Sequence, residues 1–84
     1  MHLSIYPNPI SASGHLKIEV PEDQQVHVAV RDMKGRIITQ KKVFVCKGEA
    51  TISLYSYSWK AGLYFIQCSN EKGDHRQVKV LKIR

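Results

Sequence analysis

The sequence predicts an all-β fold, an immunoglobulin-like antiparallel β-sandwich of about seven strands. The 84-residue chain is long enough for one domain only. Apolar and polar residues alternate with a period of two in segment after segment, which is typical of half-buried strands. Turn-forming residues separate these segments at spacings of about ten residues, and no stretch shows a convincing helical period. A five-stranded oligonucleotide-binding barrel is the alternative, and the expected number of strands favours the sandwich.

The first three expected strands are residues 2–6, 15–20 and 25–32. The first ends at Pro7-Asn8-Pro9, because proline fixes φ, donates no hydrogen bond and discourages a strand from continuing. The other two place Val, Leu or Ile on one face and polar residues on the opposite face, and Pro21-Glu22-Asp23 separates them. Each strand of this kind is expected to contribute one side to a core.

The last four expected strands are residues 36–46, 49–55, 63–69 and 75–83. Asp32-Met33-Lys34-Gly35 precedes them, with Asp where its carboxylate can cap a tight turn and Gly where a positive φ is wanted. Glycine-containing turns also precede the later strands. In the final strand, Val78 and Val80 alternate with polar residues and Leu81.

The charge of the chain is strongly positive, with 13 Lys and Arg against seven acidic residues, a net charge of +6. Several basic residues lie near an acidic one, as Lys17 does with Glu19 and Arg31 with Asp32. Residues 75–84, HRQVKVLKIR, carry Arg76, Lys79, Lys82 and Arg84 and no acidic side chain. Two interpretations stay open, a generally basic surface and attraction to an anionic partner such as a nucleic acid, a lipopolysaccharide or an acidic protein groove.

Residue patterns that would indicate catalysis or a cofactor are absent. The acidic residues include no pair within an apolar run, where a raised pKa would suit a general acid. The four histidines form no metal-binding spacing with each other or with cysteine, and no glycine-rich phosphate loop is present. We therefore expect no enzyme activity, no metal and no cofactor. The histidines are His2, His15, His27 and His75.

Two further features allow more than one interpretation. Cys46 and Cys68 each end an apolar strand, so they are either two buried thiols or a disulfide between strands. The segment Tyr55–Gly62, YSYSWKAG, is expected to fold its aromatic residues over the open end of the sandwich, although it could instead stack on sugars or bases. Only Phe44 and Phe65 support single-strand nucleic-acid binding, so no nucleic-acid partner is expected.

The order and spacing of these segments resemble a known family. LSIYPNP, LKIEV, VHVAVRDMKGRII, ATISL, WKAGLYFIQC and RQVKVLKIR follow one another as in the type A C-terminal sorting domain of the type IX secretion system of Bacteroidetes. Nearly the whole chain is covered. The matching positions are Pro7, Asn8 and Pro9; Asp32 and Gly35, followed by Arg36; Gly62 and Tyr64; and Val78, Lys79, Val80 and Lys82.

The resemblance implies a folded, non-catalytic address label. In that family the translocon recognises the domain after the cargo reaches the periplasm, helped by an outer-membrane shuttle protein. A cell-surface sortase then removes it, and the cargo is attached to anionic lipopolysaccharide or released. The matching positions are expected to serve recognition, and the last strand is expected to matter most. Residues 1–84 would then be one domain cut from a larger secreted protein, since Met1 directly precedes the first motif.

Physical reasoning supports this role for the corner and the last strand. A corner held by two prolines can be bound with little ordering cost. Asn8 precedes Pro9 and is expected to be extended, and Tyr64 is expected to anchor its own corner. The last strand is expected at an uncovered edge, where its lysines discourage unwanted pairing while a receptor, or a second copy in a homodimer, could pair with its backbone. The alternative function is an accessory or adhesion module that binds glycan or protein through Tyr55–Trp59.

Overall fold

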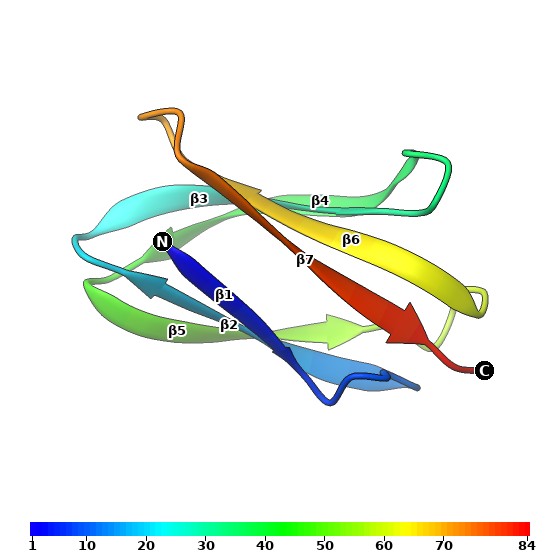
Figure 1. Ribbon diagram of the computed structural model, residues 1–84. Helices are drawn as coiled ribbons and strands as arrows, with labels where there is room; N and C mark the ends of the chain where they lie inside the picture. The colour runs from blue at the N-terminus through cyan, green and yellow to red at the C-terminus, as the bar shows by residue number, and fades with distance from the viewer.

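The computed structural model describes all 84 residues, which form seven strands (Figure 1). No α-helix with the length and hydrophobicity of a membrane span is present. The predicted strands are confirmed, and their ends move by at most two residues. The strands are β1 (His2–Tyr6), β2 (Ser13–Val20), β3 (Gln24–Arg31), β4 (Ile37–Val45), β5 (Gly48–Tyr55), β6 (Gly62–Ser69) and β7 (His75–Lys82).

The strands form two antiparallel sheets that face each other. One sheet has the order β1-β2-β5 and the other the order β4-β3-β6-β7. Figure 1 shows the two layers, with β7 and β1 neighbouring each other across the sandwich. The predicted sandwich is confirmed, and the five-stranded barrel is wrong. The specific likeness to immunoglobulin domains stays a prediction.

The core lies between the sheets and follows the alternation of the sequence. In β2, burial alternates with exposure, and Leu16 and Ile18 are completely buried. In β3, Val26, Val28 and Val30 face them from the other sheet's inner side. Each fully buried aliphatic side chain contributes about 1.5–3 kcal/mol of transfer free energy, so these strands provide much of the stability.

The turn between β3 and β4 is organised by Asp32, as the sequence predicts. Asp32 Oδ1 accepts the backbone N–H groups of Lys34 and Arg36, each at 2.9 Å, and Arg36 Nε donates to Asp32 Oδ2 at 2.9 Å. Gly35 has φ +83°, a conformation that glycine adopts without strain. Desolvation alone would raise the pKa of the Asp32 carboxyl, but the bonds from Arg36 and Lys34 and the Arg36 charge lower it below its usual value.

The expected disulfide is absent, and the interpretation of two buried thiols is right for Cys68 and wrong for Cys46. The two thiols are free, and Cys46 is exposed whereas Cys68 is buried. The reason is local, because β4 ends with Val45 pointing inward and the next residue therefore turns away from the core. Burial raises the pKa of the Cys68 thiol to about 12, which makes this thiol unreactive.

Candidate functional site

The corner, defined here as Pro7–Pro9, lies against the last strand. Asn8 Nδ2 donates to the Lys79 carbonyl oxygen at 3.2 Å, and the Leu81 N–H donates to Asn8 Oδ1 at 3.1 Å. One carboxamide thus occupies a carbonyl and an amide of β7, as a neighbouring strand would. The two parts of the sequence predicted to serve recognition form one continuous surface, although more than 70 positions separate them.

Ile10 extends this contact by one residue. Its N–H donates to the Leu81 carbonyl at 2.8 Å, and its carbonyl accepts the Ile83 N–H at 2.9 Å. The side chain is completely buried. Gly14 makes room for it, because a Cβ at position 14 would lie 2.6 Å from Ile10 Cδ1. The peptide bonds preceding Pro7 and Pro9 are both cis.

The outer edge of β7 is therefore covered in part. The strand pairs only with β6 and lies at the edge of its sheet, as predicted. The expectation that this edge is uncovered is wrong between Lys79 and Ile83, where Asn8 and Ile10 occupy it. Backbone groups of alternate residues point to the same edge, so Gln77 and the N–H of Lys79 also face outward. The outward backbone groups of Gln77 and the N–H of Lys79 have no backbone hydrogen-bond partner outside the sheet.

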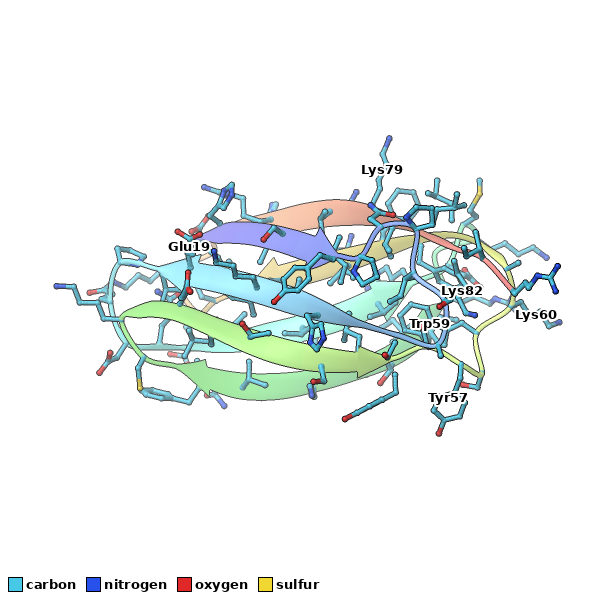
Figure 2. The ribbon with its side chains drawn as sticks, turned by 90° about the horizontal axis from the view of Figure 1, so that it is seen from below. Glu19, Tyr57, Trp59, Lys60, Lys79 and Lys82 are labelled. Atoms are coloured by element: carbon cyan, nitrogen blue, oxygen red, sulfur yellow. The ribbon has the colours of Figure 1, made fainter.

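The two lysines of β7 have opposite environments. Lys79 is exposed and projects from the edge of the sandwich in Figure 2. Lys82 is 1% exposed, and its Nζ donates to the carbonyls of Ile83 at 3.3 Å and Arg84 at 2.6 Å. Of the lysines expected to discourage unwanted pairing at this edge, Lys79 is exposed on the outer side and Lys82 is buried. The alternation of β7 places Lys82 on the same face as Val78 and Val80, which is the inner face.

Tyr64 and the loop before it close one end of the sandwich. The Tyr64 hydroxyl donates to the Lys60 carbonyl at 2.5 Å, and the Trp59 and Tyr64 rings lie 4.9 Å apart. Trp59 is buried, whereas Tyr55 and Tyr57 are 68% and 74% exposed. The predicted plug therefore consists of Trp59 alone, and Figure 2 shows Tyr57 pointing away from the molecule.

The loop is also tied to the segment that follows the corner. The buried Ser56 donates its N–H to the Ala12 carbonyl and its hydroxyl to the Ser11 carbonyl, both at 2.9 Å. Gly62 and Tyr64 are the partners of Lys82 and Val80 in the β6–β7 pairing. The corner, β7 and the start of β6 therefore form one connected structure.

The predicted site residues divide by exposure. A buried side chain cannot contact a receptor in the folded domain, so a buried site residue can affect recognition only by stabilising or shaping the surface. The exposed ones are Pro7, Asn8, Pro9, Gly35 and Lys79; Asp32, Gly62 and Val78 are half-buried; Tyr64, Val80 and Lys82 are buried. Asp32 forms no hydrogen bond with the corner and instead lines a groove between β4 and β5.

Sequence reasoning missed Ile10, Gly14 and Ser56. Ile10 carried a weak signal, as a single large apolar residue in a stretch that is otherwise polar or proline-rich. Gly14 and Ser56 carried none, because their roles depend on what the fold places beside them. No group of three His, Cys, Asp or Glu side chains is placed to hold a metal ion.

Comparison with known proteins adds the family. A family model described as the secretion system C-terminal sorting domain matches residues 4–83, nearly the whole chain. The matched range includes the corner, all of β2 to β7 and the residues that join them. No protein of curated function matches the chain.

Proposed function

The chain belongs to the family of type IX secretion C-terminal sorting domains, and from this premise we propose that the translocon recognises the surface formed by the corner and β7. Membership makes the domain a type IX secretion sorting signal, which implies interaction with the secretion machinery and export to the cell surface or secretion. Domains of this family are generally non-enzymatic.

One observation supports the proposed surface above all others. The Asn8 carboxamide bonds both Lys79 and Leu81, so the corner and the last strand are held in one geometry before any partner arrives. A receptor that binds a surface already in its bound shape loses little conformational entropy. A sorting signal must also work on unrelated cargo, which favours a surface built within the domain itself.

The proposed sequence of events is the one that membership of this family implies. Residues 1–84 act as a single domain attached to a larger secreted protein, which crosses the inner membrane first. In the periplasm, the translocon and an outer-membrane shuttle protein bind the domain. After export, a cell-surface sortase cleaves the peptide bond between cargo and domain. The cargo is then attached to anionic lipopolysaccharide or released.

The predicted site residues have two kinds of role in this proposal. Pro7, Pro9 and Lys79 contact the receptor, because their side chains are exposed beside the free part of the β7 edge. The receptor can pair there with the outward backbone groups near Gln77. The exposed Asn8 holds the corner against β7. The positions that shape the surface from beneath are Gly62, Tyr64, Val78, Val80 and Lys82. Asp32 and Gly35 shape the distant β3–β4 turn.

The test is export of a fluorescent protein that carries a leader and residues 1–84 at its C-terminus, in a host with a functional type IX system. We expect Lys79→Glu to reduce surface arrival at least several-fold, because the substitution reverses an exposed charge on the proposed contact. Lys79 uses only its carbonyl in the bond with Asn8, so the fold is kept.

Lys47→Glu is the matched control. Lys47 is equally exposed but lies in the turn between β4 and β5, away from the β7 edge, and its ammonium group forms no ion pair. Export should be unchanged. If Lys79→Glu and Lys47→Glu were exported equally well, the proposed surface would be wrong, while the family assignment would stand.

A further inference from the structure

The two sides of the sandwich differ in how they are closed. On one side, Asn8 and Ile10 connect β7 with the segment that follows β1. On the opposite side lie β4 and β5, each the last strand of its sheet. No backbone hydrogen bond joins β4 to β5, and a groove of about 520 Å³ opens between them. None of the proposed receptor-contacting residues, Pro7, Pro9 and Lys79, lines this groove.

The floor of the groove consists of core side chains. Val28, Val30, Leu54, Trp59 and Tyr64 all reach it, although each is at most 8% exposed. The rims are Ile38–Lys41 of β4 and Ser53–Tyr55 of β5. The floor would therefore accept an apolar side chain, and the rims present two strand edges with unpaired backbone groups.

A register shift in β4 shapes one rim. Val30 pairs with Thr39, whereas Arg31 pairs with Ile37, so Ile38 is the extra residue of a β-bulge. Ile38 lines the groove and is 41% exposed. Bulges redirect side chains, which accounts for Ile38 lining the groove. The outer edge of this rim is unpaired because β4 is the last strand of its sheet.

The charge of the groove is positive. Its one carboxylate, Asp32, is bonded to Arg36. Lys41 and Lys60 also line the groove, and neither forms an ion pair. Lys41 stands on the inward face of β4, opposite Val28. Two unpaired ammonium groups above an apolar floor favour a ligand that carries both carboxylates and apolar side chains.

We propose that this groove binds an extended acidic polypeptide segment of a partner protein by strand addition to β4 or β5. The rim of four β4 residues accommodates roughly four or five residues of an extended chain at about 3.3 Å per residue. Apolar side chains of the segment contact Val28 and Val30, and acidic side chains lie near Lys41 and Lys60. A glycan is disfavoured, because Trp59 and Tyr64 pack on each other and Tyr55 is the one exposed aromatic side chain that lines the groove.

The experiment is titration of the ¹⁵N-labelled domain with two seven-residue peptides that have blocked ends. One alternates glutamate with valine and the other alternates lysine with valine. We expect the acidic peptide to bind at least tenfold more tightly, with amide shifts concentrated at residues 38–41 and 53–55. The double variant Lys41→Glu/Lys60→Glu should reverse the preference.

Two matched variants keep the test decisive. Lys42→Glu changes the neighbouring lysine, which faces the other side of β4 opposite His27, and should leave binding unchanged. Lys60→Glu alone, in an exposed loop, should weaken binding several-fold without affecting the fold. Equal binding of the two peptides, amide shifts centred on β7, or binding of neutral maltoheptaose but neither peptide would each overturn the proposal. None of these results depends on export.

Discussion

Asn8 joins the first part of the chain to the last strand through its side chain alone. It is exposed, yet its carboxamide uses a donor and an acceptor on the same strand. The flanking prolines supply no N–H group for such a contact, so the side chain takes the place of the backbone. Asn8 therefore has a structural role as well as its proposed place in the recognition surface.

Asn8→Ala should lower the free energy of unfolding by about 1–2 kcal/mol, because two hydrogen bonds of about 0.5–1.5 kcal/mol each are lost. Urea-induced unfolding measures the change. Gln25→Ala is the control, since Gln25 is exposed and its side chain forms no hydrogen bond, and its effect should stay within about 0.5 kcal/mol. Equal stability of Asn8→Ala and the parent would show that the contact does not stabilise the fold.

Because its pKa is lowered by folding, Asp32 should make the free energy of unfolding depend on pH. Its pKa is lowered in the folded state, so its contribution is fully present above the usual carboxyl pKa of about 3.9 and is lost as the pH falls through the lower folded value. Asp32→Asn should therefore be less stable than the parent at neutral pH. The difference should shrink progressively below about pH 4.

Urea midpoints measured from neutral pH down to about pH 2 would test this linkage. Glu71→Gln provides the comparison, because Glu71 is exposed and forms no ion pair or hydrogen bond, and this substitution should have little effect at any pH. A constant difference between Asp32→Asn and the parent at all pH values would contradict the proposed linkage.

At the scale of elements, the edge strands are protected in different ways. The corner covers part of β7, and β4 carries Lys41 and Lys42 in its exposed middle. Lys82 adds an inward-pointing charge at the end of β7. Lysines on edges and inward-pointing charges are both known to oppose edge-to-edge pairing between molecules. The free edges thus remain accessible to a partner without being open to aggregation.

Lys82 should tolerate loss of its charge better than reversal of it. Lys82→Met should keep the stability within about 1 kcal/mol, since an apolar chain of similar length replaces a buried cation. Lys82→Glu should lose about 2–3 kcal/mol, because its carboxylate would face the carbonyl oxygens that now accept from Nζ.

Urea unfolding measures both Lys82 variants, and Lys79→Glu on the outer side of the same strand should change stability by less than about 0.5 kcal/mol. Sedimentation should show that Lys82→Met associates more readily than the parent, because the inward charge is gone. Equal stability of Lys82→Glu and Lys79→Glu would contradict the burial of Lys82.

At the scale of the whole molecule, the first and last segments of the chain hold each other in place. Met1 N lies 3.5 Å from the Asp74 carboxylate, and Asn8 and Ile10 bond β7 further along. A domain of this size buries only about 60–65% of its unfolded surface, so the loss of one strand removes a large share of its stability. The proposed recognition surface and the fold therefore depend on the same strand.

Deletion of residues 73–84 should abolish cooperative unfolding, because β6 loses its partner and Ile10 loses its backbone bonds. Amide dispersion in ¹⁵N spectra and a urea titration measure this outcome, and deletion of Arg84 alone should keep the cooperative transition. A folded 1–72 fragment would contradict it. Loss of export after the larger deletion would therefore not separate recognition from folding, whereas Lys79→Glu does.

The features that were predictable from the sequence depend on neighbouring residues. The Asp32–Gly35 turn requires a side-chain cap and a positive φ within four positions, and the residue types Asp and Gly at its two ends indicate both. The inward face of β2 and β3 follows from alternation along each strand. Even the burial of Lys82 was implied by its phase with Val78 and Val80, although lysine is rarely buried.

The partner of Asn8 was not predictable in the same way. The two backbone groups it bonds lie 71 and 73 positions away, and no local pattern indicates which strand will pass beside the corner. The burial of Ile10 beside that strand depends in the same way on contacts between distant segments. So does the burial of Trp59 as the single aromatic plug. So does the groove, which exists because β4 and β5 end their sheets on the side that the corner leaves open.

By itself, the sequence determined the strands, their inward faces, the turns and the family, because each depends on residue order over short distances. Only the tertiary structure decided which strand edges are covered and where the groove between β4 and β5 opens. Those properties arise when the two sheets pack and bring distant segments into contact, and no short stretch of the chain contains that information.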